Sequence, residues 1–415
     1  MPKRLLIPAC CLCIAILLGV RGAGYAPDAG YYRLLALGQR GAVPAPFSSR
    51  ILGPAVAGWL GRWTATGVDA GFLMAGVICL IALITLLSAL LWSWRAPTAI
   101  FAAIFFMPFW ADIFHDYYLP DLLHAAILAA MLLLLLFGSV GSALLLLFPA
   151  YLTRESTALV AICMVFALWR RTRLSNALIG LTAVSAAVLV SRHYAAAGEG
   201  TVHGMAGGGY ILGKLVWSFS KNVLGLPLWS NTLPECNPIW TTPLPHPLGA
   251  IRTIGLCSPS LWGPARLLLA WFGIFGIGPA LLLVLWRKMI STAPPSQTEP
   301  PGKAVVFRFC TVYGLTCVLL APLLGASADR LVEYGWPLYF VVLPWLLVSA
   351  SGIHRPKLAH PHITWILLLH LLTCWIAWFG FRQQVTSGYL LAGLASVALN
   401  GVTYFFIHTV DNLWI

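Results

Sequence analysis

The sequence predicts an all-α polytopic membrane protein, and two observations carry that prediction. First, 60% of the 415 residues are hydrophobic, only 9% are charged, and the mean hydropathy is +0.87. A water-soluble domain needs roughly 25% charged residues to cover its surface. Second, the apolar residues gather in runs that approach the roughly 20 residues needed to cross a bilayer. We therefore expect the lipid bilayer to be the main partner of the chain, with no separate soluble domain.

The apolar runs predict about 11–12 transmembrane or re-entrant helices. They cover residues 5–20, 71–93, 98–113, 121–137, 140–152, 156–169, 177–191, 265–286, 304–323, 337–351, 363–380 and 388–408. The runs 140–152 and 156–169 are short, which indicates either a re-entrant pair or one broken spanning unit. The first run follows two cations and also resembles a signal peptide. Because the chain is full of similar runs, an uncleaved first helix is the favoured interpretation.

The distribution of charge predicts the orientation of these helices. With Lys3 and Arg4 in the cytoplasm, the other short cytoplasmic connections are rich in Lys and Arg, as the positive-inside rule requires. Their cations are Arg95, Arg170, Arg171, Arg173, Arg287, Lys288, Lys303, Arg308, Arg355 and Lys357. Of the 12 acidic residues, only Glu299 and Asp411 fall on the same side. We therefore expect a cytoplasmic N-terminus and an acid-bearing outer face.

Chain length is concentrated in two predicted outer loops. The first loop covers residues 21–70 and includes a short interfacial helix expected near 51–64. The second covers 192–264 and is rich in Gly, Pro, Trp and Thr. A Pro-rich segment then predicts a cytoplasmic linker. The expected organisation is an N-terminal transmembrane module, this linker and a C-terminal transmembrane module, at 1–290, 291–302 and 303–415.

Net charge and cysteine placement limit the classes of binding partner and metal site that we expect. The net charge is +13, but the cations are scattered among apolar segments, so we expect anionic lipid headgroups and no nucleic acid as partner. Eight of the 10 cysteines lie in apolar runs and are interpreted as small buried hydrophobic residues. Cys236 and Cys257 share the second outer loop, and they are disulfide candidates if that loop faces an oxidising compartment. No Cys/His cluster has convincing zinc spacing.

The first outer loop carries one set of candidate site residues. Asp28 is followed by Tyr31, Arg33 and Arg50. One interpretation is a general base with nearby cations that hold an anionic lipid phosphate. The alternative is an aromatic belt at headgroup level, with arginines touching lipid phosphates. The residue types and their spacing do not decide between these two interpretations.

The second outer connection carries His115, Asp116 and Asp121. It is short, so its carboxylates are expected close to the membrane. Asp121 follows Pro120 at the start of a helix, where a carboxylate also stabilises the helix N-terminus. That local role is the alternative to a functional one for Asp121, whereas Asp116 has no comparable local explanation.

Two further charged positions lie later in the chain. Arg154 and Glu155 separate two apolar runs, and charges at membrane depth are costly unless they pair or face water. They either pair with each other or form a polar floor beneath an outer cavity. Arg330 follows Asp329 near the predicted outer side, where it is either a phosphate ligand oriented by Asp329 or part of a surface ion pair. Such a surface pair contributes under about 1 kcal/mol.

These residues together resemble a known family. One apolar helix is followed by Asp28-x-x-Tyr31-Tyr32, then by Pro46-Phe-x-x-Arg50-Ile-Leu-x-Pro54, then by an outer connection with Asp. A later Arg-Glu-Ser lies between short helices, and an Asp-Arg turn comes near the end. This order resembles the GT-C superfamily of integral membrane glycosyltransferases, in particular its small bacterial members. The resemblance covers residues 10–175 and 325–350, and its motifs are degenerate.

The resemblance implies a function. Members of that superfamily move a sugar from a polyprenyl-phosphate donor to a glycan, lipid or protein acceptor, here at the periplasmic face of the bacterial inner membrane. By resemblance, Asp28 is the general base. Asp116 or Asp121 is a second acid that helps to bind the acceptor or a divalent cation, Mg or Mn. Arg330, with Arg33 or Arg50, holds the leaving donor phosphate.

The resemblance also leaves points open. The first loop lacks the adjacent pair of acids of the best-known family pattern, so the base and the use of metal are unresolved. Tyr31, His115, Arg154 and Glu155 complete the set of substrate-binding candidates. A membrane transporter or flippase for a lipid-linked or small polar solute is the alternative, for which internal repeats and acids near the bilayer midplane are typical. The sequence shows neither clearly. A membrane scaffold without catalysis is a third interpretation.

Overall fold

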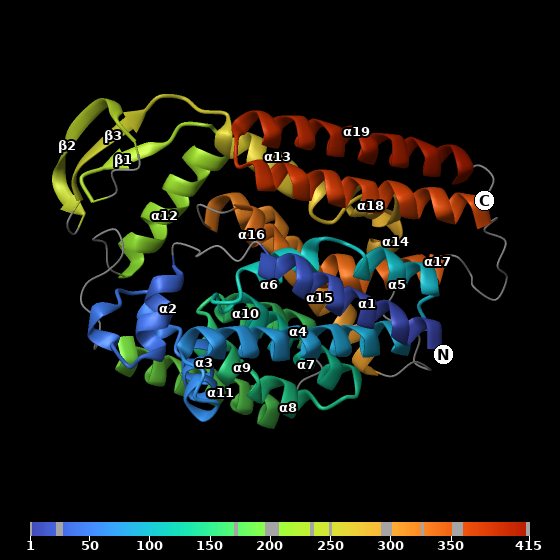
Figure 1. The fold of residues 1–415 in the computed structure, drawn as a ribbon, viewed down its shortest axis with the longest axis horizontal. Coiled ribbons are helices and arrows are strands. Elements are labelled where there is room, and N and C mark those ends of the chain that lie inside the picture. Colours follow the sequence, from blue (N-terminus) through green and yellow to red (C-terminus); the bar gives the residue numbers. More distant parts are fainter. Residues whose placement is uncertain are drawn as a thin grey trace. The chain divides into compact units, whose positions relative to one another are not determined.

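The computed structural model describes nine segments of the chain, nearly all of them helical (Figure 1). These segments are residues 2–21, 28–169, 173–195, 207–232, 236–248, 251–291, 301–324, 328–350 and 360–411. They form two compact units, of which unit 1 is 1–200 with 292–313 and unit 2 is 201–291 with 314–415. The expected division placed residues 201–291 with the N-terminal module, whereas the structure groups them with the C-terminal helices. Helix α15 (Pro301–Leu324) contributes its first half to unit 1 and its second half to unit 2.

Seven helical stretches in the described segments are long and apolar enough to cross a membrane. They are Val68–Ser93, Thr98–His115, Leu174–Tyr194, Gly302–Leu323, Ala328–Val348, Thr364–Gln383 and Thr386–Ile407. A pair bent by 65°, Trp262–Gly273 with Gly278–Trp286, would make an eighth span. Shorter apolar helices cover Leu6–Val20, Asp121–Leu136, Val140–Thr153 and Thr157–Leu168. Every predicted apolar run falls on one of these helices, which mark the chain as an integral membrane protein.

The described part of unit 1 consists mainly of helices. Their bounds are α1 Pro2–Arg21, α2 Ala29–Ala36, η1 Arg40–Ala42, η2 Phe47–Ser49, α3 Leu52–Trp63, α4 Val68–Ser93, α5 Thr98–Phe105, α6 Phe109–His115, α7 Asp121–Leu136, α8 Val140–Leu145, α9 Leu147–Thr153, α10 Thr157–Leu168 and α11 Leu174–Ala195. The helix expected near 51–64 is α3. It folds back closely on α4, because a Cβ on Gly71 would overlap the main-chain oxygen of Ala57.

The connections of unit 1 gather at two ends that differ in charge. At the polar end, side-chain contacts join residues 28–69, 115–121, 154–157 and 192–194. At the basic end, the start of α15 packs on the end of α7, and the start of α8 packs on the start of α11. The described carboxylates of unit 1 lie at the polar end or within one turn of it, and they are Asp28, Asp69, Asp112, Asp116, Asp121 and Glu155. The basic end carries Arg95, Arg173 and Lys303.

Unit 2 combines helices with a small sheet. Its helices are α12 Gly207–Asn222, α13 Trp262–Gly273, α14 Gly278–Ser291, the second half of α15, α16 Ala328–Glu333, the π-helix η4 Leu338–Val342, α17 Leu343–Ala350, α18 His360–Gln383 and α19 Thr386–Asp411. Helices α18 and α19 pack side by side (Figure 1). The strands are β1 Leu228–Ser230, β2 Pro238–Leu248 and β3 Ile251–Cys257.

The sheet is a departure from the expected all-α fold. Its order is β1-β3-β2, and both pairings are antiparallel. The central strand β3 is apolar at Ile251, Ile254 and Leu256, which suits a paired strand. Strand β2 is rich in proline and lies at an edge, where a residue without an N–H is tolerated. Helical periodicity does not reveal such a segment, so the sequence predicted only a loop there.

The bent pair α13 and α14 is stabilised by one side chain from α19. Asn400 is 4% exposed, and its Nδ2 donates to the main-chain oxygens of Phe272 and Ser396, both at 2.9 Å, with Gly276 O at 3.2 Å. Its Oδ1 accepts the N–H of Ala280 at 3.1 Å. A helix break frees main-chain groups, and in an apolar setting these groups need partners. Asn400 supplies those partners on both sides of the break.

Candidate functional site

Arg50 and Glu155 lie at the centre of the polar end of unit 1. Nε of Arg50 donates to Oε2 of Glu155 at 2.8 Å, and Nη2 donates to Oε1. Nη1 donates to the hydroxyl of Tyr32, also at 2.8 Å. The Arg50 side chain is 7% exposed and that of Glu155 is 41% exposed. Arg50 is therefore engaged with protein partners, and its expected role as a ligand for the donor phosphate stays a prediction.

Arg154 forms a second ion pair beside the first. Its Nη1 donates to Oδ1 of Asp121, the first residue of α7, and both side chains are about nine-tenths buried, at 11% and 12% exposed. Close by, Nε2 of His124 is hydrogen-bonded to Oγ1 of Thr157 at 3.1 Å. The Asp121 carboxylate thus belongs to an interhelical pair, in addition to its place in the first turn of a helix.

The two pairs follow from the backbone between α9 and α10. Arg154 has φ −160° and ψ 134°, an extended conformation. Successive side chains of an extended backbone point in opposite directions. Arg154 therefore reaches Asp121 on one side, while Glu155 reaches Arg50 on the other. Mutual pairing of Arg154 and Glu155, one of the two interpretations left open by the sequence, is therefore wrong.

The ion pair fixes the charge of Glu155. Burial favours the neutral acid and raises its pKa, but the attraction and hydrogen bonds of Arg50, with the charge of Arg154, oppose that effect. The balance lowers the pKa of Glu155 from 4.5 to about 2. Glu155 is therefore ionised at neutral pH and binds a proton only weakly.

Arg33 takes part in a third, more exposed pair. Its Nε lies 2.7 Å from Oδ1 of Asp69, and its Nη2 donates to Oδ2 at 2.7 Å. The hydroxyl of Tyr118 donates to the same carboxylate at 2.9 Å. The two charged side chains are 40% and 49% exposed. This group ties α2 to the start of α4 and to the connection that precedes α7.

The other unit 1 candidates lie in the same connections. Asp28 precedes α2, is half-buried, and forms no ion pair with another described residue. Tyr31 stacks on Phe47 with ring centroids 4.8 Å apart. Asp116 directly follows α6, and its main-chain oxygen accepts the N–H of Leu119 at 2.7 Å. His115 donates from Nδ1 to the main-chain oxygen of Gly19 at 3.3 Å, which joins α6 to α1.

Arg330 belongs to unit 2, on α16, apart in the chain from the unit 1 candidates. The sequence left two interpretations open, a phosphate ligand oriented by Asp329 or a surface ion pair. In the structure, Oδ2 of Asp329 accepts a hydrogen bond from Nη2 of Arg266 at 2.8 Å. These two side chains are 18% and 20% exposed, so the pair is largely buried rather than a surface pair.

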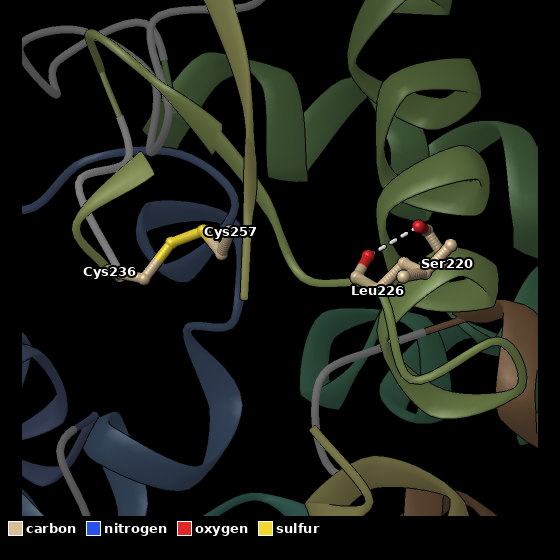
Figure 2. The surroundings of a disulfide bond; sticks show 4 residues. All are labelled: Ser220, Leu226, Cys236 and Cys257. Atoms are coloured by element: carbon tan, nitrogen blue, oxygen red, sulfur yellow. Dashed lines mark hydrogen bonds between the residues drawn. A yellow bond between two sulfur atoms is a disulfide. The ribbon is translucent and has the colours of Figure 1, made fainter. Parts of the chain in front are cut away.

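Figure 2 shows that Cys236 and Cys257 are joined by a disulfide within unit 2. Their Cα atoms are 6.2 Å apart, and Cys257 is 2% exposed. Cys257 ends β3 and is paired in register with Pro238 of β2. The disulfide therefore clamps the open end of the small sheet.

Several site residues were missed from the sequence. Tyr32, Asp69, Tyr118, His124 and Thr157 complete the polar end, and of these only Tyr32 was named from the sequence, as part of the motif that begins at Asp28. A polar residue such as His124 inside an apolar run was the one available signal. In the part of the chain that the structure describes, no group of three or more His, Cys, Asp or Glu side chains is placed to hold a metal ion.

No protein-family model matches the chain, and no curated protein matches it.

Proposed function

We propose that the chain is a membrane glycosyltransferase of the GT-C type, which transfers a sugar from a polyprenyl-phosphate donor to an acceptor at the outer, periplasmic face of a bacterial inner membrane. The polar end of unit 1 would hold the reaction. The lipid part of the donor would remain in the bilayer beside the apolar helices that start at this end.

The observation that supports this function most is the gathering of charge at one end of unit 1. Arginines and carboxylates from segments up to 105 residues apart meet there, and three of these contacts are ion pairs. Charged groups among apolar helices are costly, so their concentration at one end favours a functional role. The N-termini of α4, α7 and α10 open at the same end, and their dipoles favour anions such as a phosphate.

Asp28 is the proposed general base. It takes the proton of an acceptor hydroxyl while that oxygen attacks the anomeric carbon of the sugar. The bond between the anomeric carbon and the phosphate oxygen breaks, and its electron pair leaves with the polyprenyl phosphate. Unlike Asp69, Asp121 and Glu155, Asp28 is not engaged with an arginine of the described chain. Its proton then passes to water.

The paired residues have a positioning role in this proposal. Arg50 with Glu155, and Arg154 with Asp121, hold the break between α9 and α10 against the first loop and α7. In this proposal the exposed arginines of the polar end bind the donor phosphate. Their positive charge stabilises the negative charge that develops on the phosphate as it leaves the sugar. Arg40, stacked on the ring of Tyr194 with 4.1 Å between its guanidinium carbon and the centroid, is one of these.

The test uses membranes that contain the full chain, with and without Asp28→Asn. Loss of a general base lowers transfer by about 100-fold or more. Asp69→Asn is the matched control, because it removes a half-exposed carboxylate at the same end and should leave most of the transfer. Sugar transfer that survives Asp28→Asn unchanged would reject Asp28 as the base.

One observation favours a transporter instead. Helices α13 and α14 form a broken pair bent by 65°, and broken helices often line the solute sites of transporters. In this chain, however, Asn400 already occupies the freed oxygens of Phe272 and Gly276. Movement of a lipid-linked sugar across a vesicle membrane without any chemical change to it would support the transporter.

A further inference from the structure

Helix α12 of unit 2 exposes an apolar stripe. Leu212, Val216, Phe219 and Val223 are 65%, 54%, 41% and 38% exposed. Their spacing of four, three and four residues places them along a single face of the helix. Lys214 and Lys221 are seven residues apart and lie on the opposite face. The helix is therefore amphipathic, with its apolar side outward.

The inward side of α12 is polar and is held by specific contacts. Ser218, Ser220 and Asn222 are only 4%, 8% and 2% exposed. Oγ of Ser220 donates to the main-chain oxygen of Leu226, as Figure 2 shows. Nδ2 of Asn222 donates to the main-chain oxygen of Pro322 at 3.2 Å. These contacts fix the rotation of the helix about its axis.

The cation of Lys221 is also directed toward the protein. Its Nζ lies 5.4 Å from the ring centroid of Trp262, at the start of α13. The backbone of α12 packs there without a gap, since a Cβ on Gly263 would overlap the main-chain oxygen of Lys221. A helix with polar residues inward and apolar residues outward is the reverse of the pattern found on a protein surface in water.

We propose that α12 lies along the membrane surface with this apolar stripe in lipid. Helices with Lys on one face and Leu or Phe on the other bind in the plane of the membrane interface. Its 16 residues extend about 24 Å, which is shorter than the roughly 30 Å of bilayer hydrocarbon. The second predicted loop thus contains a membrane-bound helix rather than a wholly aqueous segment.

Continuity with the rest of unit 2 favours lipid over a protein partner. Candidate spans α18 and α19 also expose large apolar side chains, with Trp365 at 60% and Phe405 at 71%. Helix α12 contacts α13, part of the bent apolar pair of the same unit. This placement would hold the disulfide-clamped sheet, which follows α12 in the chain, at the membrane surface. The proposed placement of α12 does not depend on the proposed enzymatic reaction.

Photo-crosslinking of the full chain in vesicles of phosphatidylethanolamine and phosphatidylglycerol tests the placement. The photoreactive residue p-benzoyl-phenylalanine replaces Val216 or Phe219, and peptides are analysed by mass spectrometry after irradiation. The Phe219 replacement retains an aromatic ring at an exposed position, so the fold should tolerate it. The same residue in place of Trp365 on α18 is the lipid-facing control, and in place of Arg252, exposed on β3, the water-facing control.

We expect lipid adducts at both α12 positions, at a level close to that of the Trp365 control and several-fold above the Arg252 control. Two results overturn the placement. One is a crosslink from Val216 and Phe219 to peptides of the protein, which means that another part of the chain or a second copy covers the stripe. The other is a yield of lipid adduct no higher than at Arg252, which means that the stripe faces water.

Discussion

Arg50 and Glu155, 105 residues apart in the chain, are joined by two hydrogen bonds that make a bidentate ion pair. The Arg50 guanidinium is almost fully enclosed and also donates to Tyr32. The pair fastens the loop before α3 to the break between α9 and α10. Two parts of the chain that are far apart in the sequence are therefore joined by an ion pair at the polar end of unit 1.

Removing the charge of Glu155 should destabilise unit 1. Glu155→Gln leaves the enclosed Arg50 cation without a counter-charge, and we expect a loss of about 2 kcal/mol in the free energy of unfolding. Denaturant or thermal unfolding of the purified chain in detergent measures the change. Asp69→Asn is the control, since its pair with Arg33 is about half exposed and contributes under about 1 kcal/mol. Equal losses in the two variants would show that the Arg50–Glu155 pair contributes no more to stability than the more exposed Arg33–Asp69 pair.

The same carboxylate predicts a pH dependence. The pKa of Glu155 is lowered from 4.5 to about 2 in the folded chain. The stability contributed by its ionised form is therefore fully present above pH 4.5 and is lost as the pH falls toward 2. Unfolding of the wild-type chain and of Glu155→Gln should be compared across that window. We expect the difference between them to shrink as the pH falls, and a constant difference would contradict the shifted pKa.

Asn400 should be essential to the bent pair of unit 2. Asn400→Leu keeps the side-chain volume but leaves main-chain groups of Phe272, Gly276 and Ala280 without this partner. We expect a loss of about 2 kcal/mol in unfolding free energy. Thr403→Val is the control on the same helix, because the Thr403 hydroxyl donates to Leu399 O of its own helix, at 2.8 Å. A loss no larger than that of the control would mean that the break has other support.

The disulfide predicts a count of reactive thiols. Cys236 and Cys257 are bonded, and the other eight cysteines are free. In denaturant, a polyethylene-glycol maleimide should add to eight thiols of the untreated protein and to all 10 after reduction. The double variant Cys236→Ser with Cys257→Ser should give eight in both conditions. Ten thiols labelled without reduction would show that the disulfide is absent.

The helices could be predicted from the sequence because each apolar run is local. Long runs such as 71–93 satisfy the hydrogen bonds of their own backbone, and lipid accepts their side chains. Some residues of the polar end, such as Asp121 and Glu155, could be named as candidates, but their pairing could not be predicted. Asp121 and Arg50 reach the α9–α10 break from 33 and 105 residues away, and no local pattern records such a contact.

The second loop shows the other limit of sequence reasoning. Its sheet depends on pairing between β2 and β3, and the prolines of β2 conceal the strand pattern. Its helix α12 was missed because only part of its surface is apolar. The partner of Asp329 was also missed, since Arg266 lies 63 residues earlier, on α13. In each case the deciding contact is between segments rather than within one.

We propose that this chain moves a sugar from a lipid phosphate to an acceptor. The most direct measurement places the purified chain in vesicles with radiolabelled polyprenyl-phosphate sugars and a bacterial membrane extract as the source of acceptor. We expect that label leaves the donor, appears on an acceptor and is accompanied by free polyprenyl phosphate. Label that stays on intact donor with every sugar supplied, while the donor crosses the bilayer, would contradict a transferase and identify a flippase.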